Sequence, residues 1–144
     1  MNAIIVDASV GLKWFVPEIH SVEARKWRNP PHELHTLAVF FDIEISNVLW
    51  KKIQRAEISS LDARHISNQL PLLPLVRHSE QPLLLSALDI AERFQRTIYD
   101  SLYLALAMQL GGRMVTADQR LYNSLSTTSL AAHIAWVADS PKGP

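Results

Sequence analysis

Short apolar runs alternate with longer segments of helical periodicity along the whole chain, and this alternation limits the fold more than any other feature. The first run, Ala3-Ile4-Ile5-Val6, is apolar at consecutive positions, which suits a strand buried on both faces of a parallel sheet. Pro71 and Pro74 favour an edge position for the third run, because proline cannot donate a ladder hydrogen bond. The predicted strands span residues 3–6, 36–40, 72–76, 113–116 and 134–137.

The segments between these runs carry the signals of helix ends. Ser21 and either Ser59 or Ser60 are of the N-cap type, and Gly111-Gly112 is a usual signal for a helix C-terminus. Strands that alternate with helices predict an α/β protein with a central parallel sheet and helices on both faces. The predicted helices span residues 9–15, 21–28, 43–53, 61–70, 83–95, 101–110 and 118–125.

Length and composition are typical of one globular domain, which we place at residues 1–139 of the 144, followed by a flexible C-terminal tail at 140–144. The lack of cysteine excludes disulfides and cysteine-based metal sites. Lys and Arg total 14, as do Asp and Glu, so any surface that binds nucleic acid must be local. Without a signal-peptide pattern or a long apolar stretch, we expect a cytoplasmic protein with no membrane contact.

Four acidic residues stand among apolar neighbours, where an unpaired carboxylate costs several kcal/mol to bury. They are Asp7, Glu44, Asp100 and Asp118. Asp7 and Asp118 follow the ends of predicted strands, and Asp100 begins the helix that leads to the 113–116 strand. Since the carboxyl ends of parallel strands meet at one edge, where open α/β sheets bind their ligands, we predict a shared site there.

Three of these acids also have a purely structural explanation. Asp100 and Asp118 suit helix N-caps, and Asp7 suits a strand-end carboxylate that accepts backbone N–H groups. Glu44 has no such explanation, because it lies within a helical segment between two isoleucines and has no helix end to cap.

Several carboxylates at one point repel one another unless a cation lies between them. Carboxylate oxygens favour Mg²⁺ or Mn²⁺ over zinc, because the chain has no cysteine and its histidines lack the spacing of a metal site. His32 and His35 have an H-x-x-H spacing, but they lie at a proline-rich bend. Carboxylate-bound magnesium is the usual apparatus for phosphodiester hydrolysis. The acids therefore predict a metal-dependent hydrolase of this kind.

Each acid belongs to a longer block, and the blocks occur in a specific order. They are Val6-Asp7-Ala8-Ser9 with Leu12-Lys13-Trp14-Phe15 and Pro17-Glu18, then Glu44-Ile45-Ser46-Asn47-Val48-Leu49, then Tyr99-Asp100-Ser101-Leu102-Tyr103-Leu104-Ala105-Leu106-Ala107, and Thr116-Ala117-Asp118. In this order they resemble the PIN-domain ribonucleases of the VapC toxin type. The resemblance spans residues 3 to 137.

The resemblance implies a PIN-like fold and a Mg²⁺-dependent endoribonuclease that hydrolyses RNA phosphodiester bonds. It also implies a homodimer and a cognate antitoxin that occludes the site. The metal-binding and catalytic acids of the family correspond to Asp7, Glu44, Asp100 and Asp118. Ser9 and Thr116 match small hydroxyl residues beside the metal, and Asn47 matches a polar residue one helical turn after the helical acid. The chain departs from the family at residues 37–41, where a proline often precedes the acidic helix.

Basic residues near the acidic blocks are candidates for contacts with RNA phosphates, with a solvated charged face as the alternative. They are Lys13, Lys51, Arg96 and Arg120, with Lys52 and Arg55 close to them in sequence. Large apolar residues of the first helices exceed what a small core absorbs, which predicts self-association and partner binding. They are Leu12, Trp14, Phe15, Trp27 and Trp50. A non-catalytic PIN-like protein-binding module is the alternative function, and the complete set of acids disfavours it.

Overall fold

The computed structural model describes residues 3–29, 33–139 and 141, and a parallel sheet lies at its centre. Within these residues the sheet has five strands in the order β3-β2-β1-β4-β5, and every neighbouring pair is parallel. The strands are β1 (Ala3–Val6), β2 (Glu33–Leu37), β3 (Val76–His78), β4 (Arg113–Thr116) and β5 (Ile134–Trp136). The predicted parallel α/β fold is confirmed, and the third strand lies at an edge as predicted.

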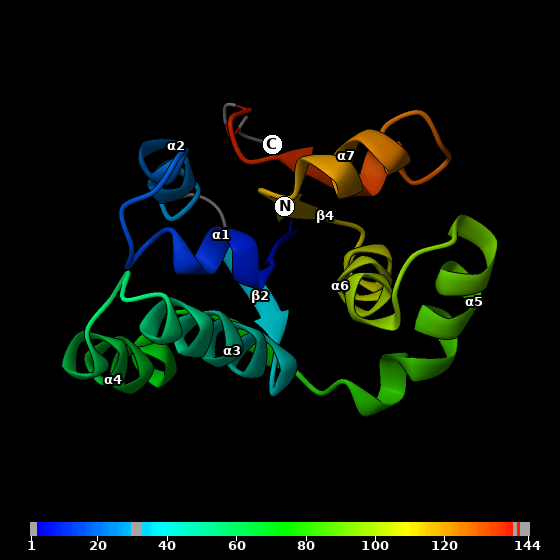
Figure 1. Cartoon of the computed structure of the whole chain (residues 1–144). Coiled ribbons are helices and arrows are strands. Elements are labelled where there is room, and N and C mark those ends of the chain that lie inside the picture. The colour runs from blue at the N-terminus through cyan, green and yellow to red at the C-terminus, as the bar shows by residue number, and fades with distance from the viewer. Residues whose placement is uncertain (1–2, 30–32, 140, 142–144) are drawn as a thin grey trace.

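Helices connect the strands and cover both faces of the sheet. Figure 1 shows α1 to α4 gathered on one side and α5 and α6 on the other. The helices are α1 (Ala8–Leu12), α2 (Ser21–Lys26), α3 (Phe40–Gln54), α4 (Ser60–Gln69), α5 (Leu84–Phe94), α6 (Ile98–Gln109) and α7 (Gln119–Leu125). Short 3₁₀ turns form at Leu70–Leu72, Gln81–Leu83 and Ala131–His133.

Some element boundaries differ from the sequence prediction. β2 ends earlier than predicted because Phe40 already begins α3. β3 begins only at Val76, since Pro71 lies in a 3₁₀ turn at Leu70–Leu72 and residues 73–75, which include Pro74, form no strand. Ser21 is the first residue of α2 and not its cap, and the cap position is His20, which makes no capping side-chain hydrogen bond.

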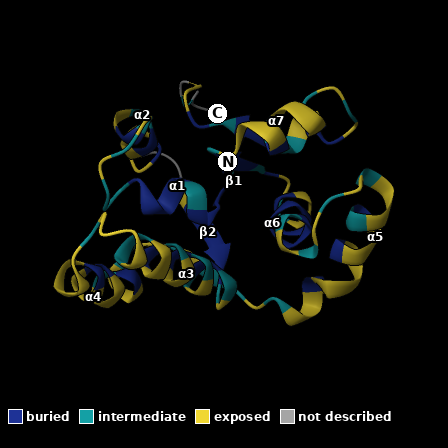
Figure 2. Ribbon diagram, viewed as in Figure 1, coloured by how far each residue is buried: buried dark blue, intermediate teal, exposed yellow. Residues whose placement is uncertain are grey.

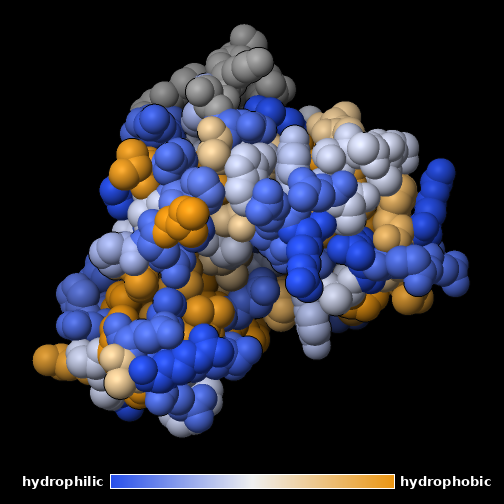
Figure 3. All heavy atoms as spheres, turned by 45° about the horizontal axis from the view of Figure 1, so that its top comes forward, coloured by the Kyte–Doolittle hydropathy of each residue, from blue (hydrophilic) through white to orange (hydrophobic). Residues whose placement is uncertain are grey.

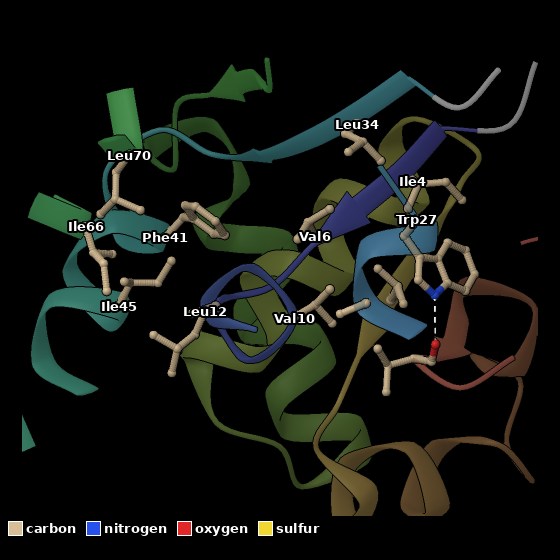
Figure 4. Close-up of a cluster of buried hydrophobic side chains, with 14 of the residues drawn as sticks. Ile4, Val6, Val10, Leu12, Trp27, Leu34, Phe41, Ile45, Ile66 and Leu70 are labelled. Carbon is tan, nitrogen blue, oxygen red and sulfur yellow. Dashed lines mark hydrogen bonds between the residues drawn. The ribbon is translucent and has the colours of Figure 1, made fainter. Parts of the chain in front are cut away.

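Two hydrophobic cores lie against opposite faces of the sheet. Because side chains alternate along a strand, Ile4 and Val6 face one core and Ile5 faces the other. The first core joins α1 to α4 to the sheet, and the fully buried Trp27 donates its indole N–H to the Val137 carbonyl there at 2.9 Å (Figure 4). The second core surrounds α6, which is buried almost all round, whereas α4 and α5 expose their outer faces (Figure 2).

The large apolar residues of the first helices mostly belong to the first core. Leu12 and Trp27 are buried in it, and Trp14 and Phe15 pack against it. Of the five residues predicted to drive self-association, only Trp50 is exposed. That reason for expecting a dimer is wrong, because the core extends under four helices and absorbs the other side chains.

Two sequence predictions fall outside the described residues: one concerns His32, and the other concerns the tail at 140–144, of which only Pro141 is described. Within the described ranges, no helix is both long and apolar enough to cross a membrane.

Candidate active site

Asp7 directly follows β1 and precedes α1, so its carboxylate lies at the carboxyl edge of the sheet. Oδ1 accepts hydrogen bonds from the Val10 backbone N–H at 3.0 Å and from the Ser9 hydroxyl at 2.6 Å. Oδ2 accepts the hydroxyl of Thr116 at 2.7 Å. The side chain therefore caps α1, as the strand-end explanation predicted, and it is only 6% exposed.

The neighbouring strand β4 ends at the same edge, and hydroxyl groups join the two strand ends. The Ser9 hydroxyl accepts the Ala117 backbone N–H at 3.0 Å, and the Thr116 hydroxyl accepts the Asp118 N–H at 3.1 Å. Asp118 then caps α7 by accepting the Leu121 N–H at 3.2 Å. The N-cap explanation of Asp118 is confirmed, and Asp118 lies at the same edge of the sheet as Asp7.

Glu44 reaches this edge from α3, whose first turn contributes to both cores. Phe40 packs into the core around α6, whereas Phe41 is buried in the core of α1 and α4. Helix α3 therefore begins where the two hydrophobic cores come together. Glu44, about one turn further along, accepts a hydrogen bond from the Tyr103 hydroxyl of α6 at 2.8 Å. This contact joins helices that cover opposite faces of the sheet.

Asp100 lies in the first turn of α6 and is not its cap. Thr97 caps the helix, and its hydroxyl accepts the Asp100 backbone N–H at 3.0 Å. The N-cap explanation of Asp100 is wrong, because the helix begins at Ile98, three residues before the predicted start at residue 101. Asp100 and Tyr103 are three residues apart and share one face of α6, so the acid lies on the helix face that supplies the partner of Glu44.

Burial raises the pKa of three of the four acids. It raises the pKa of Asp7 from 3.8 to about 6, although the hydrogen bonds to its carboxylate act in the opposite direction. It raises the pKa of Glu44 from 4.5 to about 7, and repulsion from Asp7 and Asp100 adds to this rise. Burial also raises the pKa of Asp100, with a further contribution from the charge of Asp118. Desolvation is the main cause in each case, because a charged carboxylate loses water that the protein does not replace.

Electrostatic repulsion connects all four acids in pairs: Asp7 with Asp100, Glu44 with both of these, and Asp100 with Asp118. Within the described ranges, none of the four carboxylates takes part in a salt bridge. In the same part of the chain, no three His, Asp or Glu side chains are arranged to hold a metal ion as they stand. The edge thus carries negative charge that no ion pair neutralises.

The sequence matches the PIN domain family over residues 4–124. The chain belongs to the PIN domain family. The matched segment begins in β1 and ends within α7, so it contains all four acids of the carboxyl edge.

Curated relatives of this PIN domain are named as ribonucleases. Ribonuclease VapC3 of Pyrobaculum aerophilum is 33% identical over 120 residues, which cover 82% of this chain and 91% of the relative. Ribonuclease VapC1 of Mycobacterium tuberculosis is 31% identical over 119 residues, which cover 83% of this chain and 84% of the relative. The resemblance to VapC-type PIN ribonucleases is confirmed, and the relatives support a nuclease activity.

A solved structure supports the fold independently. The crystal structure of PAE2754 from Pyrobaculum aerophilum aligns with a TM-score of 0.69 at 24% identity, over 94% of this chain and 84% of that chain. The five-stranded parallel sheet with flanking helices is therefore the PIN-like fold that the sequence predicted.

Two of the other candidate residues lie close in sequence to the acids. Asn47 is exposed on α3, one turn after Glu44. Arg96 is half-buried in the connection between α5 and α6, and its charge lowers the pKa of Asp100 against the effect of burial. This electrostatic effect makes Arg96 the basic candidate with a direct link to the acidic group.

The remaining basic candidates differ in exposure. Lys51 and Arg120 are exposed on α3 and α7. Lys13 is buried, and its Nζ lies 3.2 Å from Oε1 of Glu18. Its charge is therefore already paired within the protein.

The sequence does not predict two residues that shape this site. Tyr103 stands among aliphatic residues of α6, and the only signal for its role is that a buried tyrosine hydroxyl needs a partner. Burial and nearby acids raise its pKa well above the ordinary value, so the hydroxyl keeps its proton. Glu80 accepts the backbone N–H groups of Val39 at 2.7 Å and Phe40 at 2.5 Å, and so caps α3 from a distant segment. This cap acts where the family often has a proline, and no local pattern reveals it.

Proposed function

We propose that this PIN domain is a Mg²⁺-dependent or Mn²⁺-dependent endoribonuclease, which hydrolyses RNA phosphodiester bonds as the toxin of a toxin–antitoxin pair. The observation that carries the proposal is the group of acids at the carboxyl edge, where burial and mutual repulsion raise pKa values and no ion pair with another described residue offsets the charge. The names of the ribonuclease relatives support RNA as the substrate.

The donor set suits a hard divalent cation. Carboxylate oxygens are the ligands that Mg²⁺ prefers, and the raised pKa values reflect a charge that such a cation would offset. The residues that would hold the metal are Asp7, Glu44, Asp100 and Asp118. A magnesium ion held by these residues would activate the attacking water and stabilise the leaving oxygen of a phosphodiester.

The residues around the acids have separate tasks in this proposal. Ser9 and Thr116 donate to different oxygens of Asp7 and so hold the plane of its carboxylate against both strand ends. Arg96 contacts an RNA phosphate next to Asp100, because phosphate contacts set the register of a nucleic acid on a protein.

Polar groups further from the acids extend the proposed RNA path. Asn47 is a supporting polar group on the same face of α3 as Glu44. The exposed Lys51 and Arg120 contact flanking phosphates in this arrangement.

An antitoxin that covers the acidic edge and a homodimer belong to the same proposal. Several large apolar side chains that are at least half exposed offer surface for such contacts, among them Ile43, Trp50, Leu61, Leu72, Leu85 and Leu88. Figure 3 shows hydrophobic side chains gathered at the lower left of one face, on the side of α3 and α4, beside largely hydrophilic surface. Exposed apolar patches of this kind mark interaction sites in soluble proteins.

Cleavage of RNA by the purified protein tests the proposal. We expect cleavage with Mg²⁺ or Mn²⁺, none in EDTA, and a loss of orders of magnitude in the Asp100→Asn variant. Turnover should fall more than RNA binding, because binding rests on phosphate contacts elsewhere. Asp89→Asn, at an exposed acid of α5, is the matched control and should cleave normally.

Two outcomes would contradict the proposal. Cleavage that persists in EDTA or in Asp100→Asn would show a different chemistry. A folded protein that binds its partner but cleaves no RNA with any divalent metal would favour the non-catalytic binding module.

A further inference from the structure

Tyr103 places a polar group inside the buried stretch of α6, which runs from Ser101 to Ala107. Its side chain is 2% exposed, and the residues on either side of it in α6 are buried leucines. Its hydroxyl donates to Oε1 of Glu44 at 2.8 Å. A buried hydroxyl without a partner would cost about 1–3 kcal/mol, so this hydrogen bond strongly determines where both groups lie.

Aromatic packing holds the two helices in the position that this hydrogen bond requires. The ring of Phe40, at the start of α3, stacks on Tyr99 with centroids 4.8 Å apart and planes 14° apart. The same ring lies 6.2 Å from that of Tyr103. The first turn of α3 is therefore packed onto the first turn and a half of α6. This packing fixes the backbone of Glu44 relative to the Tyr103 hydroxyl.

The direction of the hydrogen bond leaves the carboxylate available for further contacts. Tyr103 occupies Oε1 of Glu44 and leaves Oε2 for another partner. Because Tyr103 and Asp100 are on one face of α6, a single helix carries one acid and also orients a second. A glutamate has three rotatable side-chain bonds, and the hydrogen bond from Tyr103 removes most of the positions that the Glu44 carboxylate would otherwise sample.

We propose that Tyr103 is a positioning residue, which holds the Glu44 carboxylate at the carboxyl edge and leaves its second oxygen free to take part in holding a divalent metal. This inference rests on the proposed function. Groups that orient a metal ligand in this way typically contribute about 10–100-fold to metal affinity or activity.

The Tyr103→Phe variant removes the donor and keeps the ring. We expect Mg²⁺ affinity, measured by calorimetry without RNA, and kcat to fall by about 10–100-fold, with KM for RNA nearly unchanged. Tyr99→Phe is the matched control: it lies one turn earlier in α6, 58% exposed, and it keeps the ring that stacks on Phe40. We expect this control to bind Mg²⁺ and cleave RNA normally.

A second measurement leaves Tyr103 unchanged, so it does not depend on how the first variant folds. The chain has three tyrosines, and their ring carbons bonded to oxygen give separate signals in a ¹³C-labelled sample. The Glu44→Ala variant should move the signal of Tyr103 and leave that of Tyr99 in place.

The results separate this inference from the proposed function. If the unaltered protein binds no Mg²⁺ and cleaves no RNA, the proposed function fails. If the unaltered protein does both, and Tyr103→Phe matches it in Mg²⁺ affinity and kcat, the positioning role is overturned. An unmoved Tyr103 signal in Glu44→Ala would overturn it as well.

Discussion

Two regions of this PIN domain bury charge, and they do so in opposite ways. Lys13, just after α1, is 8% exposed, and Asp7, just before it, is 6% exposed. Lys13 pairs with Glu18 at 3.2 Å, the other oxygen of Glu18 lies 3.3 Å from Lys52, and Lys52 pairs with Glu57 at 3.3 Å. Among the described residues, Asp7 has only neutral hydrogen-bond donors, and the charge of another acid acts on it.

The difference is in what balances the buried charge. Two lysines and two glutamates form a neutral network between α1, α3 and the turns after them, so each charge is offset where it stands. Among the described residues, no ion pair balances the acids at the carboxyl edge, and we expect these acids to lower the stability of the metal-free protein. Under the proposed function, a bound cation would offset this charge, and metal binding would then raise the free energy of unfolding.

The largest expected effect is a fall in stability of the metal-free protein as the pH rises. The pKa of Asp7 is 3.8 in its ordinary state and about 6 in the folded protein. Between these values the folded state keeps a proton that the unfolded state has lost, so stability declines with rising pH and then levels off. One pKa unit corresponds to about 1.4 kcal/mol, so this acid alone predicts a loss of about 3 kcal/mol. Glu44, with a pKa of about 7, extends the decline to neutral pH.

Urea unfolding between about pH 4 and pH 7.5 measures this decline. The Asp7→Asn variant should flatten the curve and match or exceed the stability of the unaltered protein at pH 7, and saturating Mg²⁺ should flatten it too. Stability that rises with pH over this range without metal would show that the edge is not strained by its charge.

A smaller effect is expected at the neutral network. Lys13→Met removes one of the two lysine partners of the half-buried Glu18 and should lower the free energy of unfolding by about 1.5–3 kcal/mol, a typical value for hydrogen bonds to charged groups. RNA affinity should change little, because the ammonium group is already paired. Lys51→Met, at an exposed position of α3, is the stability control and should unfold like the unaltered protein. A loss of RNA affinity at unchanged stability would instead place Lys13 on the RNA.

The smallest effect is expected at the cap of α3. Glu80→Ala leaves the Val39 and Phe40 N–H groups without their acceptor, and the loss of such a cap typically costs about 0.5–2 kcal/mol. Thermal unfolding should show this loss, with Glu92→Ala on the exposed face of α5 as the control. Equal melting temperatures for both variants would mean that water replaces the carboxylate at this helix end.

The order of elements was predictable from the sequence because apolar periodicity is a local property. The alternation that begins with Ala3–Val6 is retained in the folded protein, since each predicted run contributes residues to a strand of the sheet. Element ends were less predictable, because they depend on partners from elsewhere. Phe40 continues an apolar run that looks like a strand, but it begins α3, where the carboxylate of Glu80 caps the helix.

The sequence alone identified Asp7, Glu44, Asp100 and Asp118, because each acid stands out against apolar neighbours within its own short block. The tertiary structure decided which groups these acids meet. Tyr103 and Glu44 are 59 residues apart, and they meet because Phe40 packs against α6. The tertiary structure also pairs Lys13 with Glu18, whereas the RNA contact of Lys13 stays a prediction. Burial of apolar faces, summed over the whole domain, determines which elements lie together. Which polar side chains meet depends on that packing, so a local pattern in the sequence does not reveal the pairs.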